Sequence, residues 1–308
     1  MRTPCRRPPG RHLRASNKPG AIHPRAGALV PTVRETVRLS YSQTRDHAKR
    51  RGRTYPRHMS FRESEGVWAE RLGSLRNTVR QHVIATQLDG HLDGVADVLD
   101  VGCGQGTQAL RLATRGLTVT GVDLSENLLS QMRAGARAQG LNVEAICSDV
   151  AHLNEAVGGR RFDLVCAHGL LMYLDDAYEA LDTLTRQTRP EGRVSFTVRN
   201  GDALAYRPAV RGDYSAALAA FGTTDYRNEL GVNAQAHTRA QVMRWCEHLG
   251  LVIEAWYGVR VFTDGMSSDV QPSDVDITTC LAAEEQAGRR DPYRAFGSML
   301  HFVASRQG

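Results

Sequence analysis

The chain has 308 residues, which is enough for one large domain or two small ones. Its formal net charge of +6 comes from residues 1–58, where 15 basic residues stand against 2 acidic ones. The rest of the chain has 24 basic residues, all arginine, and 31 acidic residues, a net charge of −7. The negative charge of residues 59–308 argues against nucleic-acid binding by this part of the chain. No apolar run approaches the roughly 18 residues that a membrane span needs.

The first 58 residues are rich in Arg, Pro, Gly, Ser and His, and they show little apolar periodicity. We predict a disordered basic tail here. The segment has the composition of a nucleic-acid-binding arm and also of an arginine-rich organelle transit peptide. The favoured interpretation is a misassigned start, because Met59-Ser60-Phe61 resembles a natural beginning and the globular pattern follows at once.

Six cysteines stand at positions 5, 103, 147, 166, 246 and 280, without a C-x-x-C pair and without histidines at the spacing of zinc ligands. Three of them lie on or beside predicted core strands, where a free cysteine behaves as a small hydrophobic residue. The pattern predicts free thiols, a reducing cytoplasm as the location, and no metal site.

The segment Glu65–Leu92 has apolar residues at helical spacing and predicts one or two amphipathic helices that precede the sheet as a lid or cap. Arg76 stands among these apolar positions. An arginine at this place is either a solvated side chain or, if it borders a pocket, a partner for a ligand carboxylate.

The stretch around Gly102 organises the rest of the chain. Val98–Val101 is typical of a buried parallel strand, and helical spacing begins at Ala109. Gly102 and Gly104 let the backbone turn sharply and approach a ligand that a Cβ atom would push away. A dinucleotide fingerprint would require glycine at position 107, where this chain has Thr107.

Three further strands follow, and each carries a polar side chain at its carboxyl end. Leu117–Asp123 ends on Asp123, whose carboxylate can accept hydrogen bonds from both ribose hydroxyls of a nucleoside. Val143–Asp149 places its last polar residues within reach of an adenine amino group, and Phe162–His168 ends at the open edge of the sheet. Strands that alternate with helices in this way predict an α/β fold with a doubly wound sheet and a nucleoside-binding crevice.

The spacing D-x-G-x-G-x-G from Asp100 to Gly106 resembles the first motif of class I S-adenosylmethionine (SAM) methyltransferases. That resemblance implies SAM as the cofactor and a Rossmann-like sheet that is mostly parallel, with a C-terminal pair of antiparallel strands. Val252–Phe262 and Met299–Ser305 would supply that pair. We expect residues 59–308 to form a single methyltransferase domain, with insertions at 201–236 and 264–293 that cover the acceptor site.

Three pieces of the C-terminal third carry a closer resemblance, Gly258–Asp264, Asp291–Arg294 and Gly297–His301. They look like segments of the tRNA 5-carboxymethoxyuridine methyltransferase family, and the resemblance extends over about residues 61–306. Members of that family make the methyl ester of a modified uridine at the wobble position. The glycine loop and this resemblance together assign SAM binding to Arg76, Asp100, Gly102, Gly104, Asp123, Leu124, Ser148, Asp149 and His168.

A carboxylate acceptor has a pKa of about 4 and is already deprotonated at neutral pH, so its methylation needs no general base. It needs a cation that orients it, and arginine suits this role through bidentate hydrogen bonds. We predict Arg199 and Arg260 as this clamp, since both lie in strand regions that face the second half of the cleft; the alternative for each is a surface salt bridge. His168 is either a base for a hydroxyl or amine acceptor or a hydrogen-bonding group for the cofactor or backbone.

The tRNA-modifying family carries a lysine-rich run where this chain has the roughly neutral segment Thr223–Glu229. Because phosphate contacts supply most of the affinity for nucleic acid, we expect a small-molecule acceptor first and tRNA as the alternative. The usual N-P-P-Y, D-P-P-Y and Pro-Cys signatures of nucleobase methylation do not occur after the fourth strand. A third hypothesis is a SAM-binding regulator without catalytic activity.

Overall fold

The computed structural model describes residues 73–227, 232–267 and 269–308 of the chain. The predicted basic tail at 1–58 and the proposed start at Met59 lie outside these residues, as does the beginning of the helical segment expected from Glu65. Within the described ranges, no helix is both long enough and apolar enough to cross a membrane.

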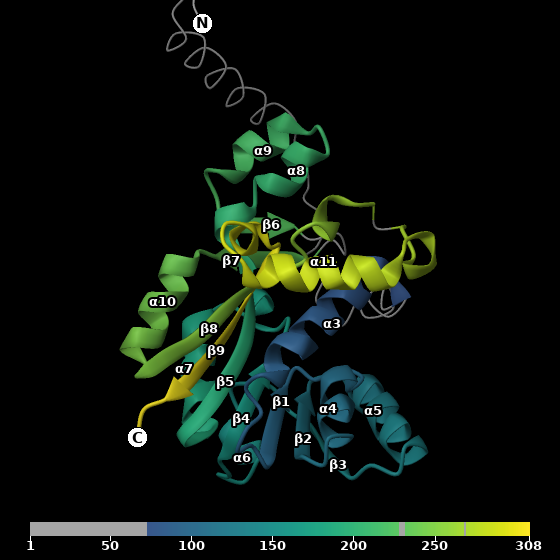
Figure 1. The fold of residues 1–308 in the computed structure, drawn as a ribbon. Coiled ribbons are helices and arrows are strands. Elements are labelled where there is room, and N and C mark those ends of the chain that lie inside the picture. Colours follow the sequence, from purple (N-terminus) through teal and green to yellow (C-terminus); the bar gives the residue numbers. More distant parts are fainter. Residues whose placement is uncertain (1–72, 228–231, 268) are drawn as a thin grey trace, which may run out of the picture. The chain divides into compact units, whose positions relative to one another are not determined.

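One mixed β-sheet runs through the described residues (Figure 1). Its strands are β1 (Asp97–Val101), β2 (Thr118–Asp123), β3 (Val143–Cys147), β4 (Phe162–Ala167), β5 (Thr188–Asn200), β6 (Asp225–Arg227), β7 (Asn233–His237), β8 (Leu251–Val259) and β9 (Met299–Arg306). The parallel strands stand in the order β3-β2-β1-β4-β5, and β9 pairs antiparallel with both β5 and β8. This order confirms the predicted doubly wound α/β class and its C-terminal antiparallel pair.

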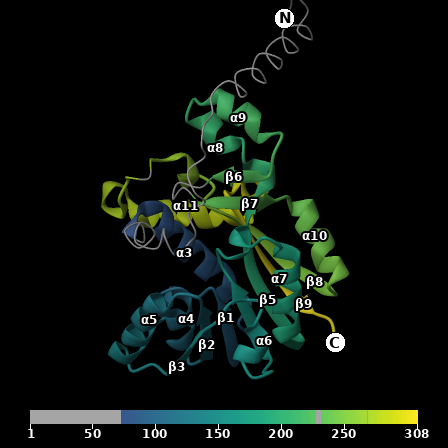
Figure 2. The ribbon, with the colours of Figure 1, turned by 180° about the vertical axis from the view of Figure 1, so that it is seen from behind.

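Helices cover both faces of the parallel strands. The helices of the described residues are α3 (Leu75–Asp89), α4 (Thr107–Ala113), α5 (Glu126–Ala138), α6 (Leu153–Ala156), α7 (Ala177–Gln187), α8 (Tyr206–Val210), α9 (Tyr214–Ala220), α10 (Arg239–His248) and α11 (Ile277–Arg289). On one face α3 and α5 bury Leu88 and Leu129 against the sheet. On the opposite face, seen from behind in Figure 2, α7 buries Leu181. Neighbouring strand residues such as Val98 and Leu99 pack into the apolar clusters on opposite faces of the sheet. Because both faces are buried, the strands are continuous apolar runs.

Side-chain caps begin the helices α5 and α10. Ser125 accepts a hydrogen bond from the Leu128 N–H at 3.2 Å, and Thr238 accepts one from the Gln241 N–H at 3.1 Å. Gly140 follows α5 with a φ of 66°, the left-handed conformation in which many helices end. These local signals fix where α5 and α10 begin beside the sheet.

Strand β5 is irregular near its start. It is one continuous strand from Thr188, although Pro190 and Gly192 lie within it. Glu191 takes a φ of 64°, and the register against β4 shifts between Phe162 and Leu164. A bulge therefore interrupts the pairing of β4 and β5 near the start of β5.

The insertion at 201–236 contributes two short strands that the sequence analysis did not predict. β7 pairs in parallel with the end of β5, Arg199 opposite Ala236 and Asn200 opposite His237, and β6 pairs with β7. Such short pairings leave too few residues for an alternating pattern to be recognised. They tie this insertion to the carboxyl end of β5.

The second insertion begins earlier than predicted. β8 ends at Val259 rather than at Phe262, because Arg260 has a φ of 57°, which lies outside the extended region. Helix α11 then lies along α3 (Figure 1), where Ile277 packs near Leu75 in a third apolar cluster.

The segments that carry the closer resemblance pack on one another beside β8. A Cβ atom on Gly258 would lie 2.4 Å from the Arg294 carbonyl oxygen, and one on Gly297 would lie 2.7 Å from the Val259 nitrogen. Only glycine allows backbones to approach this closely. The three sequence pieces therefore form one packed corner.

Candidate active site

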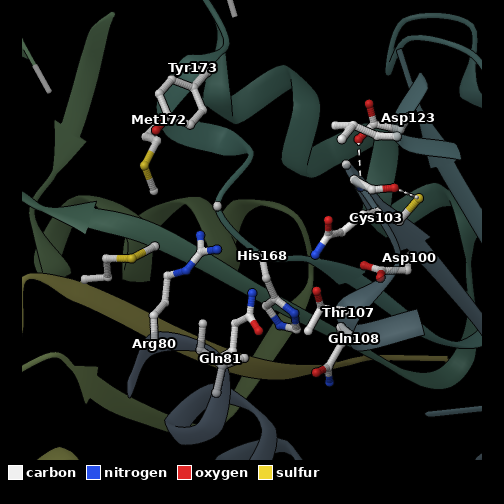
Figure 3. Close-up of a pocket in the computed structure, with 17 residues that line it drawn as sticks. Arg80, Gln81, Asp100, Cys103, Thr107, Gln108, Asp123, His168, Met172 and Tyr173 are labelled. Atoms are coloured by element: carbon white, nitrogen blue, oxygen red, sulfur yellow. Dashed lines mark hydrogen bonds between the residues drawn. The ribbon is translucent and has the colours of Figure 1, made fainter. Parts of the chain in front are cut away.

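A cavity of about 170 Å³ opens at the carboxyl ends of β1, β2 and β4, where a doubly wound sheet changes direction. Helix α3, the 3₁₀ turn Leu171–Tyr173 and the start of β9 border it from the other side. Met172 and Tyr173 lie on its wall (Figure 3).

The glycine loop after β1 forms one wall of the cavity. The Val122 carbonyl accepts hydrogen bonds from the N–H groups of Gly102 and Cys103 at 2.8 and 3.1 Å, and the Gly104 N–H donates to Asp123 Oδ2 at 2.8 Å. Gly102 and Gly104 have φ values of 71° and 55°, a region that favours glycine. The predicted sharp turn is present, and it is held on the end of β2.

Two carboxylates, Asp100 and Asp123, border the cavity on the side of the parallel strands (Figure 3). Asp100 is only 3% exposed, and its burial together with the neighbouring charge of Asp123 raises its pKa to about 7. Asp123 also accepts a hydrogen bond from the Ser125 N–H at 2.9 Å. A cationic ligand group beside Asp100 would favour its ionised form.

Arg80 of α3 stands on the opposite side of the cavity (Figure 3). Burial and the positive charge of Arg260 lower the pKa of Arg80 to about 10, so its guanidinium group stays charged at neutral pH. It donates to Asn77 Oδ1 at 2.8 Å, and a Cβ atom on Gly169 would lie 3.0 Å from its Nη1. The cavity thus has carboxylates on one wall and a guanidinium group on the other.

His168 follows β4 and lies between these walls in Figure 3. Its Nε2 is 2.9 Å from the Ser195 hydroxyl oxygen. Burial, with Arg80 and Arg111 nearby, lowers the pKa of His168 to about 3, so its imidazole is neutral at physiological pH. Its Nδ1 is buried and has no hydrogen-bond partner among the described residues.

A second group of charged side chains lies beyond the cavity wall. Arg199 Nη2 is 3.6 Å from Asp264 Oδ2, and Arg260 Nη2 is 3.2 Å from Asp264 Oδ1. Burial by itself raises the pKa of Asp264, but the charges of Arg260, Arg199 and Arg207 outweigh it and hold that pKa below its ordinary value. Arg260 also donates to Ser298 Oγ, at 2.7 and 3.0 Å.

Tyr226 connects this arginine cluster (Arg199, Arg207, Arg260 and Asp264) to the cavity. The Arg199 guanidinium lies over the Tyr226 ring, 5.3 Å from its centroid. The Tyr226 hydroxyl is 3.7 Å from the sulfur of Met172, which lines the cavity. Arg260 is close enough to affect the pKa of Arg80. The arginine cluster therefore lies next to the cavity.

Glu284 of α11 holds the turn that carries Arg260 and Asp264. Its carboxylate accepts hydrogen bonds from the N–H groups of residues 261–263 at 2.7 to 3.1 Å, and from the Thr263 hydroxyl at 2.7 Å. Glu284 is 1% exposed, so these bonds replace its hydration. Four hydrogen bonds to one buried carboxylate fix the backbone between the two charged residues.

The structure brings five of the predicted cofactor-binding residues onto the cavity wall, namely Asp100, Gly102, Gly104, Asp123 and His168. Arg76 is buried on α3, one helical turn before Arg80. The two predicted clamp residues, Arg199 and Arg260, meet at Asp264 outside the cavity wall.

The other three predicted contacts lie at the ends of β2 and β3. The Ser148 N–H donates to the Asp123 carbonyl at 3.1 Å, which brings the two strand ends together. Leu124 is half exposed, and Asp149 accepts hydrogen bonds from both the ring and the backbone N–H of His152. None of the three lines the cavity.

Sequence reasoning missed Arg80, Gln108 and Asp264. Arg80 could have been found, because it stands four residues after Arg76 and therefore on the same face of the helix. Asp264 lies in the segment Gly258–Asp264, which carries the closer resemblance, but its pairing with Arg199 depends on tertiary structure that no local pattern predicts.

Residues 98–192 match a family model described as a methyltransferase domain. The chain is 29% identical over 242 residues to the tRNA 5-carboxymethoxyuridine methyltransferase of Escherichia coli (strain K12), an alignment that covers 75% of this chain and 90% of that protein. It is 33% identical over 178 residues to the ubiquinone biosynthesis O-methyltransferase of Coxiella burnetii (strain RSA 331 / Henzerling II), with 58% and 71% covered.

A solved structure shares the fold. The Burkholderia thailandensis 1,6-didemethyltoxoflavin-N1-methyltransferase, with bound 1,6-didemethyltoxoflavin and S-adenosylhomocysteine, superposes with a TM-score of 0.52. The alignment covers 92% of this chain and 94% of that chain at 18% identity. At this identity the likeness concerns the fold alone.

The polar atoms on the cavity wall also suit SAM as a ligand. Gln108 Nε2 and His168 Nδ1 lie on this wall and are buried without hydrogen-bond partners among the described residues. A polar ligand would supply the missing partners. In the same ranges, no group of three or more His, Cys, Asp or Glu side chains gathers as a metal ion would require. The relatives, the sheet order and the charged cavity agree, and the chain therefore belongs to the class I SAM-dependent methyltransferases, with SAM as its methyl donor.

Proposed function

We propose that this methyltransferase transfers the methyl group of SAM to a carboxylate oxygen of a small anionic molecule in the cytoplasm. The observation that carries the proposal is the pair Arg199 and Arg260, whose guanidinium groups converge on the carboxylate of Asp264 beside the cavity. Surroundings that accommodate one carboxylate suit the carboxylate of an acceptor as well. Arg80 and Arg207 add further positive charge to this region.

In this proposal the carboxyl ends of the strands bind the donor. Asp100 binds the ammonium group of SAM, and Arg76 and Arg80, on the same face of α3, hold its carboxylate. Asp123 accepts hydrogen bonds from the ribose hydroxyls. The ends of β2 and β3 contact the adenine through Leu124, Ser148 and Asp149.

The arginine cluster orients the acceptor. SAM, when bound, supplies the methyl group on a sulfonium sulfur. The acceptor oxygen forms a new O–C bond as the S–C bond breaks, and no proton leaves because the carboxylate is already ionised. The main task of the chain is therefore alignment, which Arg199 and Arg260 provide as hydrogen-bond donors. The low pKa of His168 supports a hydrogen-bonding role rather than that of a base.

A second candidate is methylation of the 5-carboxymethoxyuridine carboxylate of tRNA. It is favoured by the match to the Escherichia coli enzyme of that name, which extends over 90% of that protein. The net charge of −7 after residue 58 favours the small acceptor, because a body that binds RNA needs cations for the phosphates.

The test incubates the full chain with methyl-labelled SAM and two acceptor pools from the same cells, bulk tRNA and a small-metabolite extract. Methyl esters are identified by release of the label under mild base. Base-labile label in the metabolite pool is the expected result. Base-labile label in tRNA would establish the second candidate, and base-stable label in either pool would overturn carboxylate methylation. Confirmed SAM binding without any transfer would point to the regulator.

A variant pair tests the clamp on whichever acceptor is found. Arg260→Lys keeps the positive charge but loses the planar fork, so we expect the KM for the acceptor to rise about tenfold with the SAM affinity unchanged. Arg186→Lys is the matched control, since Arg186 lies on α7 with a side chain that is 72% exposed. Equal KM values for the two variants would remove Arg260 from the acceptor site.

A further inference from the structure

Behind His168, polar side chains form a continuous hydrogen-bonded series inside the protein. His168 Nε2 is 2.9 Å from Ser195 Oγ, which is 2.8 Å from His301 Nε2. His301 Nδ1 is 2.8 Å from Gln87 Oε1, and Gln87 Nε2 donates to the Gly258 carbonyl at 3.0 Å. Gln87, Ser195 and His301 are each 0% exposed, so solvent does not share these bonds. We call this series the histidine relay.

The sheet positions the middle of the relay. Ser195 pairs with Val303 and Thr197 pairs with His301 across β5 and β9, so Ser195 and His301 are diagonal neighbours on one face. The Thr197 hydroxyl, on the same face, accepts a hydrogen bond from the Gly169 N–H at 2.8 Å and holds the turn after His168. The rings of His168 and His301 stand perpendicular, with centroids 5.2 Å apart.

The Gly258 carbonyl determines the direction of every proton in the relay. A carbonyl can only accept, so the amide nitrogen of Gln87 must face it and the Gln87 oxygen must face His301. His301 Nδ1 therefore carries a proton and, in a neutral ring, its Nε2 accepts from the Ser195 hydroxyl. The single Ser195 proton is then used, so His168 Nε2 must be the donor to Ser195.

Both histidines are neutral in this environment. Burial, with positive charges nearby, lowers the pKa of His168 to about 3 and that of His301 well below its ordinary value. A neutral His168 with its proton on Nε2 has an unprotonated Nδ1. That Nδ1 is the buried atom without a partner among the described residues, on a side chain that lines the cavity.

We propose that Gln87, His301 and Ser195 are positioning residues that hold His168 in its Nε2–H tautomer, so that Nδ1 accepts a hydrogen bond from an N–H or O–H group of the bound cofactor. The opposite tautomer would direct a proton at that group and repel it. The inference depends on SAM binding in this cavity and is independent of the acceptor, so it survives if the proposed carboxylate methylation fails.

The first test is ¹⁵N NMR of the full chain labelled at histidine, without cofactor. The expected result is two opposite neutral tautomers, His168 protonated on Nε2 and His301 protonated on Nδ1. Asparagine substitutions at each position assign the signals. A proton on Nδ1 of His168 would overturn the proposal.

Two variants then interrupt the relay at different points. In Gln87→Leu, His301 loses the acceptor that orders it, and we expect His168 to show a mixture of tautomers and SAM affinity to fall about three- to tenfold in calorimetry. Ser195→Ala interrupts the relay without changing Gln87 and should give the same two effects. It keeps the proposal testable if Gln87→Leu does not fold.

The chain offers a matched control in Gln187, which is 3% exposed and donates to Asn154 Oδ1 at 3.2 Å, with no bond to the relay. Gln187→Leu makes the same chemical change and should leave both the His168 tautomer and the SAM affinity unaltered. An unchanged His168 tautomer in Gln87→Leu and Ser195→Ala, or an equal loss of SAM affinity in Gln87→Leu and Gln187→Leu, would overturn the proposal.

Discussion

Asp100 is the residue whose ionisation the site changes most clearly near neutral pH. Its burial and the charge of Asp123 raise its pKa from 3.8 to about 7 in the free protein. Between these pH values the native state binds more protons than the unfolded chain does. The contribution of Asp100 to the free energy of unfolding is therefore full below about pH 4, and it is lost as pH rises toward 7.

Binding of SAM should show the opposite trend. The ammonium group of SAM favours the ionised form of Asp100, so we expect SAM affinity to rise by up to about tenfold from pH 6 to pH 8 and then to level off. Calorimetric titrations across this range measure the effect, and Asp100→Asn should flatten the profile. A slope that persists in Asp100→Asn would assign the titration to another group.

Some residues of the site could be predicted from the sequence and others could not. The positions of Gly102, Gly104 and Asp123 on the cavity wall were predictable, because they depend on a local order of strand, turn and strand. The relay was not predictable, because Gln87 and His301 lie on α3 and β9, far apart in the sequence, and their bond exists only after folding. A buried glutamine or histidine has no sequence signature of its own.

At the scale of elements, α11 acts on the site through Glu284. The carboxylate orders the turn between Arg260 and Asp264 with four hydrogen bonds. Glu284→Gln turns one acceptor oxygen into a donor that faces N–H groups, and we expect the free energy of unfolding to fall by about 2–4 kcal/mol in urea titrations. The KM for the acceptor should rise, since the clamp is no longer held in place.

The next residue supplies the control for this substitution. Glu285 is 31% exposed on its side chain, and its Oε1 is 2.5 Å from His82 Nε2. Exposed pairs contribute about 0–1 kcal/mol, so Glu285→Gln should change the free energy of unfolding by less than about 1 kcal/mol. Equal losses for the two variants would mean that the turn does not depend on Glu284.

The elements beside the cavity were largely predictable from the sequence, and the short strands of the insertion at 201–236 were not. β1, β2 and α5 have strong apolar patterns and a side-chain cap, so their types and limits followed from the sequence. β6 and β7 have little pattern, because they owe their pairing to the end of β5 rather than to their own residues.

At the scale of the whole molecule, charge separates the first 58 residues from the rest. The former carry a net charge of +13 and the latter −7. We expect the full chain to bind bulk tRNA without sequence preference and with a steep dependence on salt, because lysine and arginine would neutralise phosphates. A protein that starts at Met59 should lose this binding and keep its SAM affinity.

Fluorescence anisotropy with labelled tRNA at increasing salt measures the difference between the two proteins. The control is calorimetry with SAM, which reports whether the shorter protein retains the cofactor site. Equal tRNA affinity in both proteins would place the RNA-binding surface in residues 59–308 and would strengthen the tRNA-modifying candidate.

The pairing between β5 and β7 constrains any attempt to graft a new acceptor specificity onto this enzyme. Arg199 stands in the register with Ala236, at the junction of the insertion and the sheet. A transplanted segment that shifts this register by one residue would present its opposite side chains to Arg199. Chimeras should therefore exchange residues between Asn200 and Ala236 without changing the alignment of β7 with β5. Such an exchange leaves the SAM-binding cavity intact while the range of methylated molecules is redesigned.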